Sequence, residues 1–407
     1  MPSNLRIALR FLTARKRSML MSLAGIVFGV GFFIVTQAQT SGFEDFFIRT
    51  ILGTNGALRV EYHIQSVSDP DAPAAPPGTR VSSDGSILNP EQVAAAVRRF
   101  DNVSGVSLIL QAGVDIVSSA FAAPARIYGV NLDDQLAVSD LARQIVRGDL
   151  ADYRRTPNGA LVGTALAEWL HLGVGDTFTI EAEGQTRRYR ICALYETGIR
   201  DIDKERVYLH LDEARSLLQR PGAASFIQVS LFDPDRAPED ARQIQIVIQH
   251  TVSSWQQREK SWLEVFRALR LSSAITVSTI ILVAGLGIFN TLALLVMEKT
   301  KDIAILRSMG YTRGDIAQIF LYQGLLVLLF GALLGCLFGA AGTWGVSRLP
   351  IRIRGIFSTN SFVVLWSVWH YVAAVATATV VVIIASLIPA RRAARLEPGD
   401  IVRGTAQ

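Results

Sequence analysis

The sequence is short of charged residues and of cysteine. Charged side chains make up 18% of its 407 residues and hydrophobic ones 50%, whereas an average soluble domain is about 25% charged. There are only two cysteines, Cys192 in a mixed segment and Cys336 in a long apolar run, so we expect no disulfide framework. These shortages exclude a disulfide-stabilised secreted domain and fit an ordinary soluble enzyme poorly.

Motifs of the common catalytic classes are also missing. No Gly-x-x-x-x-Gly-Lys-Ser/Thr phosphate loop occurs, and the dipeptide Gly-Lys is absent altogether, so this chain is not predicted to hydrolyse ATP. There is no His-Glu-x-x-His or Gly-x-Ser-x-Gly pattern, and the histidines have no metal-ligand spacing. We therefore expect no catalytic residue, no metal site and no cofactor bound by this chain.

Long uncharged runs are what the sequence has instead. Residues 18–43, 271–297 and 316–347 carry no charge, and residues 355–390 carry only His370. Each run exceeds the ~20 apolar residues that cross a bilayer core, so we predict four membrane spans rather than buried core helices. The first run is too long for the core of a signal peptide, and we interpret it as an uncleaved span. An aromatic cluster around His370 resembles an interfacial belt and places the start of the last span there.

Basic residues flank these runs unevenly. Lys and Arg in short flanks favour the cytoplasmic side of a membrane, and three basic flanks fall on one side, so we expect both termini in the cytoplasm. The flank on the opposite side also carries arginines, which blunts the asymmetry without reversing it. The basic residues are Arg6, Arg10, Arg15, Lys16 and Arg17, then Lys299, Lys301, Arg307 and Arg313, then Arg391, Arg392, Arg395 and Arg403, and on the opposite side Arg348, Arg352 and Arg354.

Residues 44–270 lie outside the cytoplasm in this topology and differ in charge from the rest. They hold 24 Lys/Arg against 30 Asp/Glu, a net charge of −6, so the remainder of the +5 chain carries +11. Strand and helix patterns are mixed along the block, which predicts an α+β domain. Residues 65–90 hold five of the 14 prolines and are predicted to be a flexible insertion. The predicted strands are residues 57–62, 106–117, 125–130, 177–181, 187–195, 206–210 and 226–231, and the predicted helices are residues 90–100, 164–171, 211–218 and a long one from 238 toward 270.

Two apolar stripes adjoin the membrane on the outside, each on one face of a predicted helix. They form either a stalk that continues the first two spans or two separate helices that lie on the lipid surface. The stripes consist of Phe43, Phe46, Phe47 and Ile51, and of Trp262, Val265, Phe266 and Leu269.

Small residues recur at helix-packing spacing within the spans. Gly25 and Gly29 form a Gly-x-x-x-Gly pair in the first span, and Gly331, Gly335 and Gly339 form a triple in the third. This spacing lets helix backbones approach closely, although glycine is also simply common in membrane helices. The triple is the stronger signal and predicts that the third span packs against a neighbour.

The loop between the second and third spans, residues 298–315, contains a short apolar helix ended by Gly310. An apolar face in an aqueous loop needs the membrane surface or a partner's cleft. Docking into another protein is the sharper interpretation. The apolar residues are Ile303, Ile305, Leu306 and Met309.

Several motifs resemble one family. Residues 293–324, with the core Asp302-Ile-Ala-Ile-Leu-Arg-Ser-Met-Gly310, resemble the FtsX-like permease domain of MacB-type ABC transporters, and residues 389–398 look like that family's final motif. Residues 160–176 are similar to its periplasmic core domain. The N-terminal motifs, Gly42-Phe-Glu44 among them, and residues 262–270 resemble the lipoprotein-releasing (Lol-type) permeases.

The resemblance implies an α-helical membrane protein with four transmembrane helices and a large α+β periplasmic domain inserted between helices 1 and 2, in the bacterial inner membrane. It implies a separate ABC ATPase dimer that binds ATP and Mg, a second permease subunit in a homodimer or heterodimer, membrane lipid, and no nucleic acid. The segments are residues 1–17 (cytoplasmic), 18–43 (span 1), 44–270 (MacB-like core with stalk helices), 271–297 (span 2), 298–315 (coupling loop), 316–347 (span 3), 348–369 (periplasmic), 370–389 (span 4) and 390–407 (cytoplasmic).

The family works by mechanotransmission, in which ATP-driven closure of the ATPase dimer pushes the loop helix and the first two spans carry that motion outward. The residues that the resemblance assigns to ATPase coupling are Glu298, Asp302, Ile303, Leu306, Arg307, Met309 and Gly310, with the apolar ones as knobs that enter the partner and the charged ones as anchors. Substrate would enter between spans 1 and 2 at the outer leaflet, near Phe43, Phe46, Phe47, Ile51, Trp262, Phe266 and Leu269.

One departure bears on the substrate. The Lol-type subunit that recruits a periplasmic chaperone uses an extended hook between two strands, whereas residues 180–189 here contain only a tight turn. The chain therefore resembles the partner subunit without a hook, or a homodimeric relative. Lipoprotein release is the favoured function. The alternatives are export of a drug, peptide or glycolipid with a periplasmic adaptor, and an FtsX-like signal transducer that activates a cell-wall hydrolase.

The predicted topology can be tested by labelling. A cysteine introduced at Asp133 is expected to react with a membrane-impermeant maleimide in intact spheroplasts, because the topology places this position outside the cytoplasm. Labelling only after permeabilisation would contradict the topology.

Overall fold

The computed structural model describes residues 7–8, 16–62, 86–87, 89–118, 121–349, 353–354, 358–359 and 362–395. Most of the proline-rich segment 65–90, the final motif beyond Arg395 and the basic residues Arg6, Arg10 and Arg15 lie outside the described residues. The chain divides into two compact units. The helical unit comprises Met1–Asp45, Glu264–Pro350 and Ser361–Gln407, and the sheet unit comprises Phe46–Leu263 and Ile351–Asn360.

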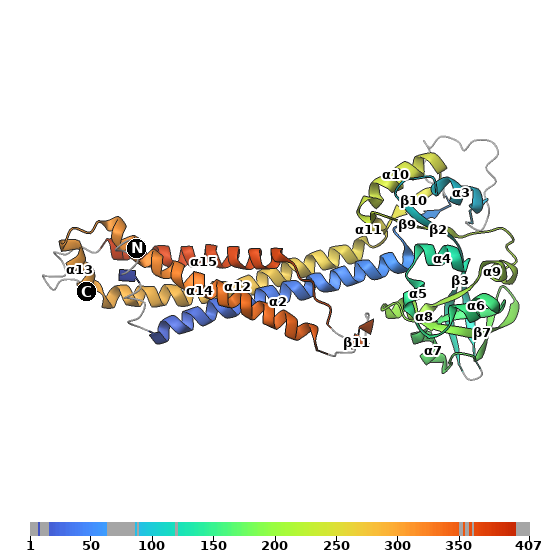
Figure 1. Ribbon diagram of the computed structural model, residues 1–407, viewed down its shortest axis with the longest axis horizontal. Coiled ribbons are helices and arrows are strands. Elements are labelled where there is room, and N and C mark those ends of the chain that lie inside the picture. Colours follow the sequence, from blue (N-terminus) through green and yellow to red (C-terminus); the bar gives the residue numbers. More distant parts are fainter. Residues whose placement is uncertain are drawn as a thin grey trace. The chain divides into compact units, whose positions relative to one another are not determined.

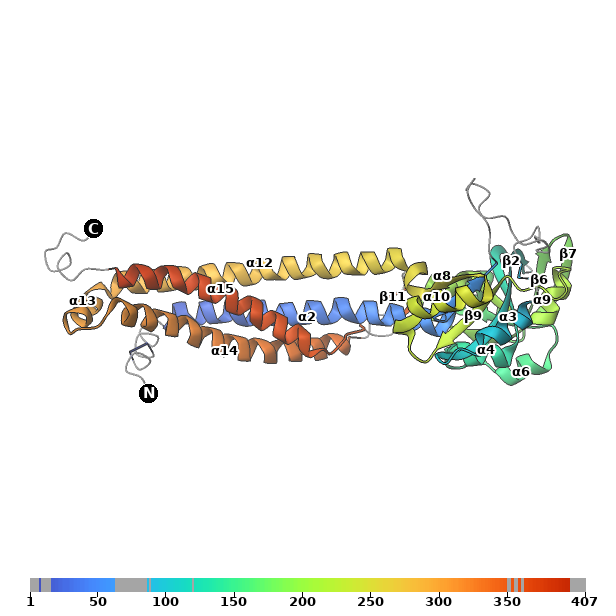
Figure 2. The same ribbon diagram turned by 90° about the horizontal axis from the view of Figure 1, so that it is seen from above.

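Four long helices build the helical unit and run side by side with alternating direction (Figures 1 and 2). Each is long and apolar enough to cross a membrane. The start of α2, the short helix α13 and the end of α15 lie at the same end of this bundle (Figure 1). The four long helices are α2 (Lys16–Asn55), α12 (Lys260–Glu298), α14 (Arg313–Ser347) and α15 (Val368–Ala394), and the short helix is α13 (Thr300–Ser308).

The two apolar stripes are parts of uninterrupted helices. The Phe43 stripe lies within α2, which extends to Asn55 and ends where Gly56 takes a φ of +65°, a conformation that glycine adopts without strain. The Trp262 stripe lies within α12, which begins at Lys260. This continuity favours the stalk over two separate helices on the lipid surface.

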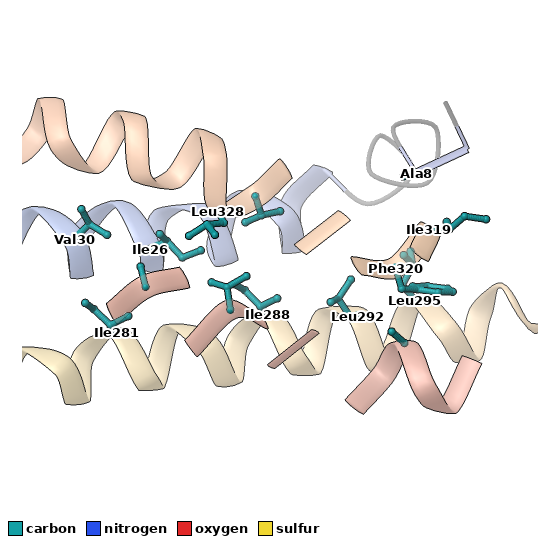
Figure 3. Close-up of a cluster of buried hydrophobic side chains, with 14 of the residues drawn as sticks. Ala8, Ile26, Val30, Ile281, Ile288, Leu292, Leu295, Ile319, Phe320 and Leu328 are labelled. Atoms are coloured by element: carbon teal, nitrogen blue, oxygen red, sulfur yellow. The ribbon is translucent and has the colours of Figure 1, made fainter. Parts of the chain in front are cut away.

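Aliphatic side chains from all four helices fill the interior of the bundle (Figure 3). Ile26 and Val30 of α2 are buried there together with Ile281 and Ile288 of α12 and Phe320 of α14. The outward residues of the same helices are also apolar, with many large aliphatic side chains exposed. Helices that are apolar on every side are typical of a lipid environment.

The glycine triple of α14 forms the contact with α2. A Cβ atom on Gly331, Gly335 or Gly339 would lie 2.8 to 2.9 Å from the nearest side-chain atom of α2. The residues of α2 that they meet are Ile26, Val30 and Ile34 in that order, so the two helices run parallel in register at a spacing of four. On another face of α2, Gly25 and Gly29 meet Ala284 and Ile281 of α12.

The sheet unit contains one large mixed sheet with strand order β10-β1-β9-β2-β3-β8-β5-β7-β4, and β6 pairs with β2 and β7. Its strands are β1 (Leu58–Glu61), β2 (Val103–Val117), β3 (Ala122–Val130), β4 (Ile145–Gly148), β5 (Gly159–Gly163), β6 (Thr177–Ala182), β7 (Gln185–Tyr195), β8 (Arg206–His210), β9 (Phe226–Leu231) and β10 (Thr251–Ser254). A separate pair is formed by β11 (Ile353–Arg354) and β12 (Ser358–Thr359).

Helices cover the sheet in two groups (Figure 1). One apolar cluster joins α3, α10 and α11 to strands β1, β9 and β10, and another joins α7 and α9 to strands β3, β5 and β8. The helices are α3 (Pro90–Val97), α4 (Leu132–Val138), α5 (Leu141–Gln144), α6 (Leu150–Arg155), α7 (Thr164–Leu170), α8 (Arg200–Glu205), α9 (Leu211–Leu217), α10 (Ala237–Ile248) and α11 (Trp255–Arg258), with a 3-10 turn at Pro234–Arg236. The unit is therefore an α+β domain between the first two long helices.

The seven predicted strands are present, but the single long helix from residue 238 toward 270 was a wrong prediction. α10 ends at Ile248, its C-cap residue Gln249 takes a left-handed φ of 53°, and residues 251–254 form β10, an edge strand paired with β1. A capping box between Ser254 and Gln257 then starts α11. Pairing with a distant strand overrode the local helical pattern. The tight turn at Glu183-Gly184 joins β6 to β7, in which Ala182 pairs with Gln185.

The contact between α14 and α2 predicts a position-specific cost for a single methyl group. Gly335→Ala is expected to lower the temperature at which helical circular dichroism is lost in detergent, because its Cβ would lie 2.8 Å from Val30 and overpacking costs about 1–3 kcal/mol. Gly287→Ala in α12 is the control, because a Cβ there meets nothing within 4 Å and alanine favours a helix. Equal melting of the two variants would contradict this packing.

Candidate functional site

The short helix α13 is held firmly at both ends. Only Lys299 separates it from α12, and the Lys299 Nζ lies 2.8 Å from Asp302 Oδ2 in the first turn. At its other end the N–H groups of Gly310 and Tyr311 donate to the carbonyl oxygens of Arg307 and Leu306, each at 3.2 Å. This is a Schellman motif, and Gly310 supplies the left-handed φ of +97° that it requires.

The following helix starts at once. Thr312 and Asp315 form a capping box, in which the Asp315 N–H donates to Thr312 Oγ1 at 3.2 Å and the Thr312 N–H donates to Asp315 Oδ2 at 2.9 Å. α13 is thus connected to α12 and to α14 with almost no slack, so a displacement of α13 has to reach both helices.

The apolar residues of α13 divide between two faces. Ile303 is 1% exposed, and it and the partly buried Leu306 pack against the core of the bundle. Ile305 is 57% exposed and Met309 72% exposed. With the exposed Lys301 and Ser308 they form the outer face of α13, in which residues 301, 305 and 309 follow at a spacing of four. Sequence reasoning did not assign Ile305 to coupling, because periodicity alone does not say which side of so short a helix faces its own bundle.

One pair of the predicted substrate-access residues and one ion pair join α2 to α12. Within the sheet unit the rings of Phe47 and Trp262 lie 5.5 Å apart, and Phe47 is buried. Within the helical unit Glu44 pairs with Arg270 at 3.3 Å.

The remaining access residues have separate surroundings. Phe43 stacks edge-on against Phe362, with ring centres 6.2 Å apart. Ile51 and Phe266 are buried, Phe46 is half-buried, and Leu269 is exposed on α12. The structure therefore brings Phe47 and Trp262 together, and the Leu269 side chain is exposed.

An extended segment before α15, residues 362–367, lies on α2 near the same position. The Leu365 N–H donates to the Ala38 carbonyl at 2.9 Å, and Ser41 Oγ lies 3.2 Å from His370 Nε2. A Cβ on Gly42 would lie 2.5 Å from the Val363 carbonyl oxygen. Sequence reasoning missed this segment; its only signal was the absence of a side chain at Gly42.

Among the residues that the structure describes, the polar groups buried inside the bundle are uncharged. Ser22 Oγ and Thr291 Oγ1 are 3.0 Å apart, and Gln323 is fully buried. No charged side chain of the described helices is buried there. The described ranges also contain no cluster of three His, Cys, Asp or Glu side chains that could hold a metal ion.

Two family comparisons match different parts of the chain. Residues 274–398 match the FtsX-like permease C-terminal family, and residues 19–247 match the MacB-like periplasmic core domain family. The first match covers the larger part of α12 and all of α13 to α15, and the second covers nearly all of α2 and most of the sheet unit.

Individual relatives are similar at modest identity. The lipoprotein-releasing system transmembrane protein LolC of Xylella fastidiosa is 26% identical over 434 aligned positions that cover 99% of each chain. The uncharacterized ABC transporter permease YknZ of Bacillus subtilis is 24% identical and covers 98% of each chain. The macrolide export ATP-binding/permease protein MacB of Acinetobacter baylyi is 34% identical over 31% of this chain and 18% of its own length.

A substitution at Gly310 tests whether the Schellman motif fixes the end of α13. Gly310→Ala is expected to loosen the Schellman motif, because a left-handed conformation costs a side chain about 1–2 kcal/mol while its Cβ would meet nothing within 4 Å. The amides of Gly310 and Tyr311 should then exchange with deuterium about tenfold faster. Gly314→Ala in the first turn of α14 is the control, and unchanged exchange in Gly310→Ala would contradict the assignment.

Proposed function

The chain belongs to the ABC transporter permeases that carry a MacB-like periplasmic core domain, and we propose that it releases lipoproteins from the inner membrane. Membership and the four apolar helices imply a multi-pass protein of the bacterial inner membrane. The proposal of lipoprotein release is supported by the relatives that carry this activity in their names and align over nearly the whole chain. The termini and α13 are proposed to be cytoplasmic and the sheet unit periplasmic.

The observation that carries the proposed coupling to an ATPase is the outer face of α13. Apolar side chains at Ile305 and Met309 are exposed beside Lys301 on a helix that is anchored at both ends. Such a face calls for a cleft in a partner, and the partner proposed here is the separate ATPase dimer, which binds ATP and Mg. A second permease subunit, identical or related, is proposed to complete the transporter, with a periplasmic chaperone or adaptor as the outer partner.

The mechanism proposed is mechanotransmission. Closure of the ATPases moves α13, and α13 moves α12 because a single residue joins them. α12 and α2 both extend from the helical unit into residues of the sheet unit. Their displacement would part the contacts Glu44–Arg270 and Phe47–Trp262 and admit the acyl chains of a lipoprotein from the outer leaflet. The neutral interior of the bundle agrees with extrusion at the outer surface instead of passage through a pore.

Coupling through α13 is tested in proteoliposomes that contain this permease, its partner permease and the ATPase. Ile305→Asp is expected to abolish lipoprotein-stimulated ATP hydrolysis and release, because a carboxylate at the centre of an apolar contact is costly to bury. Ile246→Asp is the control, since Ile246 is also an exposed isoleucine, on α10 of the sheet unit. Leu306 is less suitable for this test, because it packs against the bundle and its substitution would report on folding.

The two readouts separate the coupling assignment from the substrate. Unchanged ATP hydrolysis in Ile305→Asp would contradict the docking of α13. The coupling would stand if Ile305→Asp lost the ATP hydrolysis that the wild type shows. If the wild type nevertheless released no acylated lipoprotein, lipoprotein would be rejected as the substrate.

A further inference from the structure

The sheet unit contains a cavity of about 470 Å³ that neither coupling nor substrate access uses. Its wall is formed by the end of α2, by strands β1, β3, β8, β9 and β10, and by α11 with the residue that follows it. A volume of this size is in the range of small-molecule sites. All lining residues belong to the sheet unit.

The polar wall follows from the alternation of side chains along the strands. In β1, Leu58 and Val60 belong to the apolar cluster with α3 and α10, whereas Arg59 and Glu61 line the cavity. β9 repeats the pattern, because Ile227 and Val229 are in the apolar cluster whereas Phe226 and Gln228 line the cavity. Arg59 pairs with Gln228 on one side and with Ser253 on the other, so polar side chains of three strands meet in one row.

Arg206 places a buried positive charge at this wall. It is 7% exposed, and it donates from Nη1 to the Tyr208 hydroxyl at 3.1 Å and from Nη2 to Asn55 Oδ1 at 2.8 Å. Its guanidinium carbon lies 4.2 Å from the ring centre of Tyr128. None of the carboxylates described in the structure forms an ion pair with it. A guanidinium has five N–H donors, and burying its charge without a counter-ion is costly.

Arg258 brings a second positive charge to the same cavity. Its Nη2 donates to the carbonyl oxygens of Asn55 at 3.4 Å and Gly56 at 2.9 Å. Burial, and then the positive charge of Arg59, lower the pKa of Arg258 to about 10. Glu259 also lines the cavity, and burial raises the pKa of its carboxyl group, but the two do not form an ion pair within 4 Å in the part of the chain that the structure describes.

Of the three arginines that line the cavity, Arg59 forms an ion pair with a carboxylate, that of Glu61. Its Nε lies 2.6 Å from Glu61 Oε1, and its guanidinium carbon lies 3.7 Å from the ring centre of Phe226. The wall therefore holds three arginines against Glu61 and Glu259, together with two aromatic rings. Guanidinium groups stacked on rings and facing a cavity are a common arrangement for binding carboxylate or phosphate.

We propose that this cavity binds a small organic anion, whose carboxylate or phosphate is held by Arg206 and Arg258 and whose apolar part lies against Phe226 and Tyr128. The anion would supply the counter-charge that the described residues do not. Because Asn55 is the last residue of α2 and α11 ends immediately before α12, the bound anion would contact the junctions of both long helices with the sheet. The proposal does not rest on lipoprotein release.

The test uses the purified full-length protein in a neutral detergent. Phenyl phosphate and benzoate serve as probes, and benzyl alcohol is the neutral analogue; binding is followed by calorimetry and by the rise in unfolding temperature. Both anions are expected to bind and to stabilise the protein, and benzyl alcohol is not. Displacement of phenyl phosphate by phosphatidylglycerol in mixed micelles would identify a lipid headgroup as the source of the anion, and its failure would identify a soluble ligand.

Variants locate the site. Arg258→Gln is expected to weaken phenyl phosphate binding by about 10- to 100-fold, because it removes a charge-assisted hydrogen bond. Arg143→Gln is the matched control, since Arg143 makes the same charge change on a side chain that is 88% exposed and does not line the cavity. Arg206→Lys keeps the charge but loses the planar pair of donors, and it provides a second measurement if Arg258→Gln does not fold.

Three results would overturn the proposal. The first is that neither anion binds the wild type at concentrations up to about 10 mM. The second is that benzyl alcohol binds as well as the anions do. The third is that Arg258→Gln and Arg206→Lys bind phenyl phosphate as tightly as Arg143→Gln does.

Discussion

The close approach of α14 to α2 is the constraint on which the helical unit depends. Lipid tails are as apolar as the helices themselves, so membrane helices associate through close packing rather than by leaving water. Here the packing requires the missing side chains at Gly331, Gly335 and Gly339, each of which faces a β-branched residue of α2. Because α2 also contacts α12 through Gly25 and Gly29, it is the helix against which two others are positioned.

Short connections join α13 to the helices that precede and follow it. α13 is joined to α12 through one residue and to α14 through a Schellman motif and a capping box. The contact of α14 with α2 is parallel and in register at three glycines that follow at a spacing of four. In the proposed mechanism, a displacement at α13 would pass to α12 directly and to α2 through α14.

Much of this architecture could be predicted from the sequence, because it depends on composition over long windows. The uncharged runs indicated four long helices, and branched and aromatic residues indicated seven of the strands, whereas β4, β5 and β10 were not predicted. β10 was missed because its pairing with β1 lies almost 200 residues away in sequence and the local pattern of residues 251–254 is compatible with a helix.

The candidate sites were less predictable, because they too depend on contacts between residues that are distant in the sequence. The apolar stripe on α13 could be predicted from the sequence. Which of its residues face the bundle, as Ile303 does, and which face outward, as Ile305 does, depends on where the bundle lies. The segment that crosses Gly42 and the arginine cavity join residues from distant elements. The alternation of Arg59 and Glu61 in β1 was the one local sign of the cavity, and it matches any strand with a solvent-facing side.

Weaker partners share the positive charge of the arginine cavity. The C-terminal end of a helix carries a partial negative charge of roughly half an electron, and Arg258 donates to the last carbonyl groups there. Arg206 has an amide oxygen and aromatic rings, none of which matches a carboxylate. Since Asn55 contacts both arginines, a shift of the end of α2 changes both sites of anion contact. By linkage, an anion that binds one position of α2 more tightly must favour that position by the same factor, which ties the occupancy of the cavity to the helix that runs back through the bundle.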